Sequence, residues 1–159
     1  MTRRYGRAPK GERAVGSVPG NHGPNITIVG TLGLEGMAAV ASLEGAVNGV
    51  IFRKFVEETL GPTLVAGDVV VMDNLPAHKV KGIAEAIQGR GAQLVYLPPY
   101  SPDLSPIELC WSKVKTYLRQ AKARSQEGLE AALEQALETV TSFDAQGWFR
   151  HCGYALHPS

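Results

Sequence analysis

Two carboxylates, Asp73 and Glu108, occur in settings where acidic side chains can do chemistry. Asp73 ends the apolar run 69–72, which predicts a buried strand followed by a turn. Glu108 comes just after Ser105-Pro106, a pair typical of a helix start. The 34 residues between the two acids suffice for one helix and one strand, so the chain can return beside itself. Converging carboxylates are the ligands that a Mg²⁺ site for phosphoryl transfer requires.

The elements that would position these acids alternate between strand and helix patterns. β-Branched or alternating apolar runs predict strands at 25–32, 37–43, 69–72 and 93–97, with the first two forming a hairpin. Apolar residues at helical spacing predict helices at 50–60, 79–88, after Pro106 and after Ser125. The order β-β-α-β-α-β-α-α indicates an α/β fold and places Asp73 at the carboxyl end of a strand, where such sheets bind ligands.

Each polar candidate also has a structural explanation. Asp73, before Asn74-Leu75-Pro76, suits an Asx turn, and Glu108 completes the capping box Ser105-Pro106-Ile107-Glu108. Asp103 fits turn chemistry rather than a third carboxylate. His78 lies at the start of a predicted helix, where a lone histidine is more often structural than catalytic.

These motifs resemble the catalytic domain of the Tc/mariner transposases and their bacterial relatives, the insertion-sequence 630 family. The matching residues are MDN at 72–74, His78, and LPPYSPDLSPIE at 97–108 followed by Trp111. The resemblance covers most of the chain, starting at TRRYGRAPKGER at 2–13. It implies a ribonuclease-H-like fold, with a mixed sheet flanked by helices. In that fold Asp73 and Glu108 would be the second and third members of an Asp-Asp-Glu triad.

The resemblance also implies the chemistry. The triad would hold two Mg²⁺ ions, with Mn²⁺ as a substitute, and Asp73 and Glu108 would be both catalytic residues and metal ligands. Asn74 and His78 would border the site. The function implied is that of a transposase catalytic domain, which cleaves DNA strands and joins transposon ends to target DNA.

One departure from the family concerns its first Asp. That Asp lies on a central first strand, shortly before the segment matching 2–13, and no acid before Asp73 has such a setting. We therefore expect the fold to lack its first central strand, and the chain to be unstable or inactive alone, or to borrow a strand from a partner. That partner would be a second copy or a full-length transposase. The alternative is a non-catalytic remnant that binds DNA or transposase and inhibits it. An unrelated Mg²⁺-dependent nuclease of the same fold fits the proline-rich motif less well.

The net charge of +1 does not by itself indicate a nucleic-acid partner, but the basic residues are clustered. We predict DNA contacts from Arg3, Arg4 and Arg7 near the N-terminus and from Lys113 and Lys115 after Glu108. A solvated arm and a solvated helix face explain the same residues. Tyr100, in the proline-rich loop, is predicted either to touch DNA or to pack.

The composition, 44% hydrophobic, fits a soluble globular protein. We expect a basic arm or loop at 1–24, a partial catalytic domain at 25–124, and a C-terminal helix and tail at 125–159. No apolar run reaches about 18 residues, so no membrane span is expected. The distant cysteines Cys110 and Cys152 predict reduced thiols, with Cys110 in the core, and a cytoplasmic protein. The resemblance to the insertion-sequence family further implies a bacterial, nucleoid-associated location.

Overall fold

The computed structural model describes residues 8–13, 15 and 25–156. The chain divides into two compact units. The larger unit contains Pro24–Cys110 and Val140–Ser159, and the smaller contains Met1–Gly23 and Trp111–Thr139. Of the predicted DNA contacts, Arg3, Arg4 and Arg7 lie outside the described residues.

The larger unit begins with the predicted hairpin, which the structure confirms. Strand β1 (Ile26–Gly33) pairs antiparallel with β2 (Gly36–Glu44), and Leu34-Glu35 form the turn between them. Gly36 has a φ of 121°, a conformation that favours glycine. The glycine therefore makes so tight a connection possible.

A second, parallel pair carries the carboxylate at 73. Strand β3 (Val69–Met72) pairs with β4 (Gln93–Tyr96), and the Leu97 N–H continues the ladder by donating to the Met72 carbonyl at 2.8 Å. The predicted buried strand is present, but it is buried on one face only. Val70 and Met72 are buried, but Val69 and Val71 are 56% and 37% exposed, so only alternate residues face the core.

The helix predicted at 50–60 is present, with a change of winding along its length. Helix α1 (Gly49–Phe55) continues into a π-helical turn (Val56–Leu60) and a 3₁₀ turn (Gly61–Thr63). Asn48 caps α1 by accepting hydrogen bonds from the N–H groups of Val50 and Ile51, both at 3.0 Å.

The helix predicted at 79–88 is shorter than expected. A 3₁₀ turn spans Pro76–Lys79, and α2 runs only over Ile83–Gln88. Gly82, with a φ of 101°, separates the two, because a left-handed residue cannot continue a right-handed helix. The apolar period of the sequence did not show this break.

Three further helices follow β4. A 3₁₀ turn (Pro102–Leu104) leads into α3 (Pro106–Ala121), and α4 (Gln126–Glu138) begins at the predicted cap Ser125, whose Oγ accepts from the Gly128 N–H at 3.1 Å. The tail forms α5 (Ser142–His151), capped by Thr141 and Asp144. Cys110 and Cys152 are not joined in a disulfide and both are buried, which confirms the predicted core position of Cys110.

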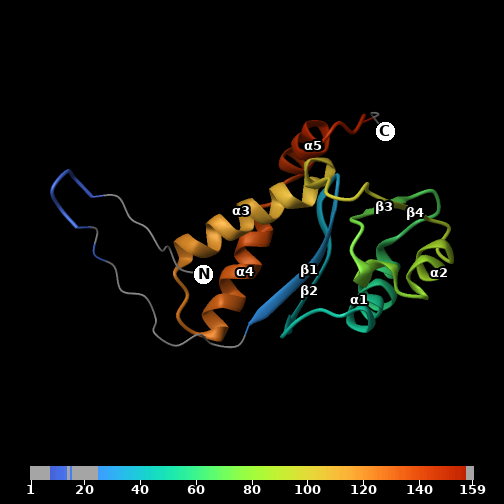
Figure 1. Cartoon of the computed structure of the whole chain (residues 1–159), viewed down its shortest axis with the longest axis horizontal. Helices are drawn as coiled ribbons and strands as arrows, with labels where there is room; N and C mark the ends of the chain where they lie inside the picture. Colours follow the sequence, from blue (N-terminus) through green and yellow to red (C-terminus); the bar gives the residue numbers. More distant parts are fainter. Residues whose placement is uncertain (1–7, 14, 16–24, 157–159) are drawn as a thin grey trace. The chain divides into compact units, whose positions relative to one another are not determined.

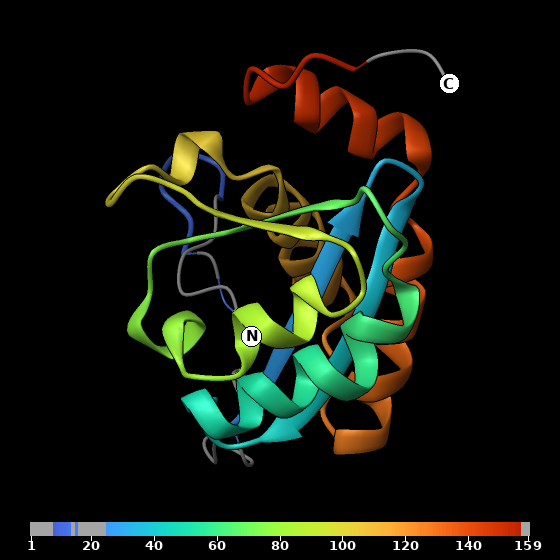
Figure 2. The same cartoon turned by 90° about the vertical axis from the view of Figure 1, so that its right-hand side faces the viewer.

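Both strand pairs of the larger unit share one hydrophobic core. Its buried residues include Ala39 of β2, Val70 and Met72 of β3, and members of α1 and α2. Figure 1 shows β3 and β4 beside α1 and α2, and Figure 2 shows those two helices lying over one face of the β1–β2 hairpin. Within the described residues no ladder joins the two pairs. One edge of β1 and one edge of β3 are therefore unpaired there.

Within the part of the chain that the structure describes, no helix is both long enough and apolar enough to cross a membrane.

Candidate active site

Asp73 is the first residue after β3 and lies at the carboxyl end of the parallel pair. Its Oδ1 accepts a hydrogen bond from the Leu75 N–H at 3.2 Å, which is the Asx turn that the sequence suggested. The side chain is nevertheless 47% exposed. The turn holds one carboxylate oxygen in place while the group stays open to solvent.

His78 makes the closest contact to this carboxylate. Its Nδ1 lies 2.5 Å from Asp73 Oδ1, and because a carboxylate only accepts hydrogen bonds, Nδ1 carries the proton. The imidazole packs on the Phe52 ring at a centroid distance of 4.1 Å and is only 19% exposed. Tyr96 of β4 donates its hydroxyl to the His78 carbonyl at 2.8 Å. The histidine is thus fixed from three sides and orients Asp73.

Asn74, the other residue predicted to border the site, has an unusual environment. Its side-chain Oδ1 is buried and has no hydrogen-bond partner among the described residues. Burying an amide oxygen without a partner costs free energy, so such an atom calls for an explanation. An amide oxygen can bind a metal ion, and Asn74 directly follows Asp73 in the chain.

Glu108 lies in the first turn of α3. Its N–H donates to the Ser105 carbonyl at 3.1 Å, while its carboxylate is exposed and has no hydrogen-bond or ion-pair partner within the described residues. The reciprocal side-chain bond of the suggested capping box is therefore not formed in this part of the chain. A helix N-terminus favours a negative charge, so the position suits an ionised, available carboxylate.

The segment between β4 and α3 is ordered by prolines and by a residue distant in sequence. Leu104 N–H donates to the Ser101 carbonyl at 3.2 Å, and the hydroxyl of Tyr154 donates to the Leu104 carbonyl at 2.9 Å. Burial raises the pKa of Tyr154, and the neighbouring Cys152 raises it further, so its hydroxyl stays a donor at neutral pH. Asp103 is exposed within the 3₁₀ turn, in keeping with its predicted turn role. No local pattern points to this role of Tyr154, because its partner lies 50 residues away along the chain.

The structure brings some of the predicted residues into contact and not others. Asp73 and His78 touch, whereas Glu108 makes no hydrogen bond or ion pair with either of them. Among the described residues, no group of three or more His, Cys, Asp and Glu side chains is placed to hold a metal ion. The described contacts therefore join Asp73 with His78, next to the Asn74 amide oxygen that has no partner, and they leave Glu108 outside this cluster.

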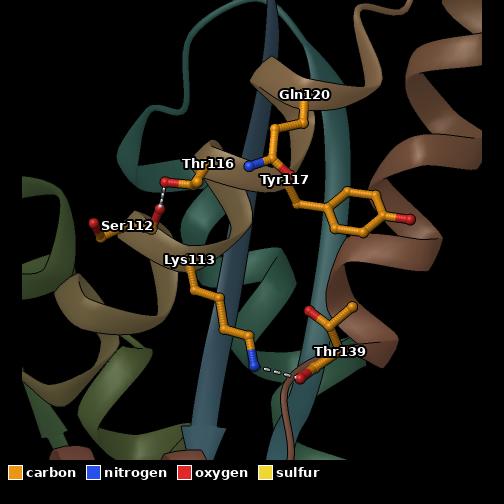
Figure 3. A pocket seen from close by; sticks show the side chains of 6 residues that line it. All are labelled: Ser112, Lys113, Thr116, Tyr117, Gln120 and Thr139. Carbon is orange, nitrogen blue, oxygen red and sulfur yellow. Dashed lines mark hydrogen bonds between the residues drawn. The ribbon is translucent and has the colours of Figure 1, made fainter.

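The smaller unit holds the two lysines that were predicted to contact DNA. Lys113 donates from Nζ to the Thr139 carbonyl at 2.6 Å, at the end of α4 (Figure 3). It lines a hollow of about 320 Å³ with Ser112, Thr116, Tyr117, Gln120 and Thr139. Lys115, by contrast, is exposed. Of the two cations, Lys113 thus already serves as a partner for the last carbonyls of a helix.

Exposed cations at the C-terminal part of α3 and directly after it form a basic ridge, defined as Lys115 and Arg119 of α3 and Lys122, the first residue after the helix, and no acid occurs between 109 and 126. At 100° per residue, Ser112 and Thr116 share this face. The exposed side of α4 carries instead the acids Glu127, Glu130, Glu134 and Glu138. Charge is therefore segregated between the two helices.

Comparison with known proteins places this chain in a family. Residues 1–130 match the family model described as DDE superfamily endonuclease. Two transposable-element transposases of Caenorhabditis briggsae are similar. Tcb1 is 25% identical over 122 residues, covering 74% of this chain and 45% of that protein, and Tcb2 is 28% identical over 105 residues, covering 64% and 38%. The chain thus spans less than half the length of these relatives.

Solved structures agree on the fold. The Mos1 transposase paired-end complex with left transposon end has a TM-score of 0.72 at 17% identity, covering 94% of this chain and 46% of that chain. The catalytic domain of Mos1 mariner transposase has a TM-score of 0.60 at 13% identity, covering 79% and 66%. These likenesses confirm the expected ribonuclease-H-like fold. With most of its length matched by the family model, the chain belongs to the DDE superfamily endonucleases of the Tc1/mariner transposase type.

Proposed function

We propose that this chain is the catalytic part of an enzyme that cleaves DNA strands and joins them to target DNA, with divalent metal ions held by Asp73 and Glu108. The observation that carries the proposal is the exposed Asp73 carboxylate at the end of β3, oriented by His78. The relatives support it by name, being transposases, and the Mos1 structures include complexes with a transposon end and with Mn or Mg.

The donor set fits a hard divalent cation. Mg²⁺ prefers carboxylate and carbonyl oxygens, and the site offers carboxylates at 73 and 108 and the orphaned Oδ1 of Asn74. Asp73 Oδ1 is engaged by His78 and by the Leu75 N–H, which leaves Oδ2 for a metal. When bound, the ions would activate water or a DNA 3′-hydroxyl and stabilise the leaving oxygen at phosphorus, with Mn²⁺ able to replace Mg²⁺.

The chain's own residues position this chemistry. His78 fixes one oxygen of Asp73, and its packing on Phe52 prevents the imidazole from turning away. A side chain that hydrogen-bonds to a metal-binding carboxylate sets the orientation and the basicity of that carboxylate. The exposure of both carboxylates leaves room for a large substrate such as a DNA strand.

A third carboxylate would complete the site, and the sheets suggest how it arrives. The unpaired edges of β1 and β3 belong to two strand pairs that share one core. A strand inserted between them would pair with both edges and join the sheets, and an Asp at its end would stand near Asp73. We propose that such a strand, from additional sequence or from a partner copy, supplies the missing acid, and that the chain alone does not cleave DNA at a useful rate.

DNA is the proposed partner, both as transposon ends and as target. The basic ridge of α3 would bind phosphates, with hydroxyls of Ser112 and Thr116 beside it. Lys115 is the ridge member that we predicted from sequence, and Lys113 would contribute only while keeping its bond to Thr139. We further propose membership of the insertion-sequence 630 group and a cytoplasmic, nucleoid-associated location in a bacterium.

The test is Mn²⁺ binding followed by cleavage. Calorimetry should show Mn²⁺ binding that is lost when Asp73→Ala and Glu108→Ala are combined and kept in Asp103→Asn, an exposed acid of the same segment. Nicking of a supercoiled plasmid should be negligible for the chain alone. Metal-dependent nicking that Asp73→Ala abolishes would show that two carboxylates suffice, and would contradict the proposed third one.

A non-catalytic role is the alternative, supported by the unpaired strand edges and by the absence of a three-acid cluster in the described residues. Such a protein would bind DNA or a transposase and inhibit it. It would bind DNA without binding Mn²⁺, and adding it to an active relative would lower the rate of cleavage. Mn²⁺ binding that depends on Asp73 and Glu108 would contradict this alternative, because a non-catalytic remnant is expected not to bind the metal.

A further inference from the structure

Tyr100 is both strained and fully exposed. Its φ is 57°, in the left-handed region that bulky residues rarely adopt, and its relative exposure is 102%. Lys122 is the other positive-φ residue besides glycine in the described part of the chain. An unfavourable backbone conformation at a residue whose ring points into solvent is a combination that stability does not explain.

The ring is not held by packing of its own. No hydrogen bond or ring contact involves Tyr100 among the described residues. Sequence reasoning left open whether Tyr100 packs or touches DNA, and the exposure excludes packing within the described chain. Something outside these residues must therefore account for an aromatic side chain at this position.

The backbone around Tyr100 is rigid. Pro98 and Pro99 precede it and Pro102 follows it, and each fixes its own φ. Ser101 Oγ donates to the Pro99 carbonyl at 3.4 Å. Farther along, the 3₁₀ turn is fastened through Leu104 to Tyr154. The prolines therefore restrict the backbone around Tyr100, which lowers the backbone entropy that the loop would lose on binding.

The loop also starts and ends at the candidate site. Leu97 donates its N–H to the carbonyl of Met72, the residue directly before Asp73. Tyr100 lies three residues after Leu97, so the Cα atoms of Leu97 and Tyr100 are within about 11 Å of each other. At its other end the same segment leads into α3, whose first turn carries Glu108. The segment that carries Tyr100 therefore connects the strand beside Asp73 with the helix turn that holds Glu108.

We propose that Tyr100 is a stacking platform for an unpaired nucleobase of the DNA held at this site, an inference that rests on the proposed function. An aromatic face stacks on any base, and no charged neighbour restricts this one, since prolines and Ser101 flank it. Bases inside an intact duplex are covered, so the ligand must have an unstacked base at an end, a mismatch or a distorted step.

The experiment measures DNA binding in a metal-free, chelator-containing buffer, with two probes. One is a short duplex with a single unpaired 2-aminopurine, and the other is the fully paired duplex. Tyr100→Asn keeps a residue that tolerates positive φ and removes the ring. It should weaken binding to the unpaired probe by about 5- to 150-fold and abolish quenching of 2-aminopurine fluorescence. Tyr100→Phe should bind like the wild type.

The matched control is Phe143→Ala, which removes another exposed aromatic ring, 85% exposed, from α5 and should change neither probe. An equal loss on both probes in Tyr100→Asn would overturn the proposal, and so would no loss. A loss in Tyr100→Phe as large as in Tyr100→Asn would assign the effect to the hydroxyl and also overturn it. Because metal is absent, failure of Mn²⁺ binding or of cleavage leaves this readout intact, so the two proposals fail separately.

Discussion

The Nδ1 atom of His78 lies 2.5 Å from Oδ1 of Asp73, while the same imidazole packs on Phe52 at 4.1 Å. The histidine therefore packs against a core residue and is also the partner of an exposed acid. Because Phe52 holds the imidazole in place, the imidazole in turn fixes the orientation of the exposed Asp73 carboxylate. From the sequence, both a structural role and a site-bordering role were open for His78. Its contacts with Phe52 and Asp73 combine a packing role with a contact to the acid.

Replacing His78 by Phe should weaken Mn²⁺ binding by about 10- to 100-fold, because the hydrogen bond from His78 orients the Asp73 carboxylate that would bind the metal. The Phe ring keeps the contact with Phe52 and removes only the hydrogen bond to Asp73. Calorimetric titration measures the change. His151→Phe, at an exposed histidine ending α5, is the control. Equal Mn²⁺ affinities for the two variants would contradict a positioning role.

Glu85 should make stability sensitive to acid. Its own N–H and that of Gly82, the latter at 2.9 Å, lower the pKa of its carboxyl below 4.5, and burial only partly opposes them. A lowered folded pKa means that this stabilisation is complete above the ordinary pKa and is lost as the pH falls through the folded value. Urea unfolding over a pH series should show this fall.

The control for Glu85 is Glu85→Gln, which keeps a hydrogen-bond acceptor without a titrating charge. Its unfolding free energy should lie below that of the wild type at neutral pH, and the difference should shrink in acid. A difference independent of pH would show that the charge of Glu85 adds nothing to the cap of α2.

Gly49→Ala should destabilise the larger unit by about 1–3 kcal/mol, because the added methyl group overlaps Val80 Cγ2 and Val80 is stiff at χ1. Urea unfolding measures the effect. Gly147→Ala, in α5 with nothing within 4 Å of the new atom, should instead stabilise by about 1 kcal/mol. Destabilisation by both substitutions would show that the space around Gly49 is not the cause.

Lys122→Gly should stabilise the protein by about 0.5–1 kcal/mol. Lys122 follows the last residue of α3 and has a φ of 49°, the position where helices favour glycine. The comparison variant is Lys115→Gly, inside the same helix, which should destabilise by about 1 kcal/mol. Thermal or urea unfolding measures both variants. Changes of the same sign in the free energy of unfolding would contradict the explanation from the backbone conformation of Lys122.

Replacing the basic ridge Lys115, Arg119 and Lys122 by Gln should lower the slope of log K against log salt for duplex DNA by about 2–3, since each phosphate contact contributes about 0.9. Gln is nearly as good a helix former as Lys, so folding should be unaffected. Fluorescence anisotropy at several salt concentrations measures the slope.

The control removes three cations of the larger unit with the same substitution, namely Lys54, Lys81 and Arg90. It changes the net charge equally, so it should reproduce any effect that is due to overall charge alone. If this triple variant lowers the slope as much as the ridge variant does, α3 is not a specific contact surface.

The sequence by itself determined the elements that local chemistry specifies. The hairpin follows from β-branched residues and a glycine turn, the start of α4 from Ser125, and the position of Asp73 at the end of β3 from an apolar run that stops there. The proline-rich motif after β4 was sufficient to identify the family before any coordinates. In each case the cause lies within a few residues along the chain.

Tertiary structure alone decided the features that depend on distant partners or on burial. It showed that β3 is half exposed, that Gly82 interrupts the helix predicted at 79–88, and that Lys113 bonds to Thr139. It also tied Leu104 to Tyr154 and left the Tyr100 ring in solvent. Periodicity reports which side of an element is apolar. Which neighbour covers that side, and which polar atom finds a partner there, is fixed only when segments far apart in sequence pack together.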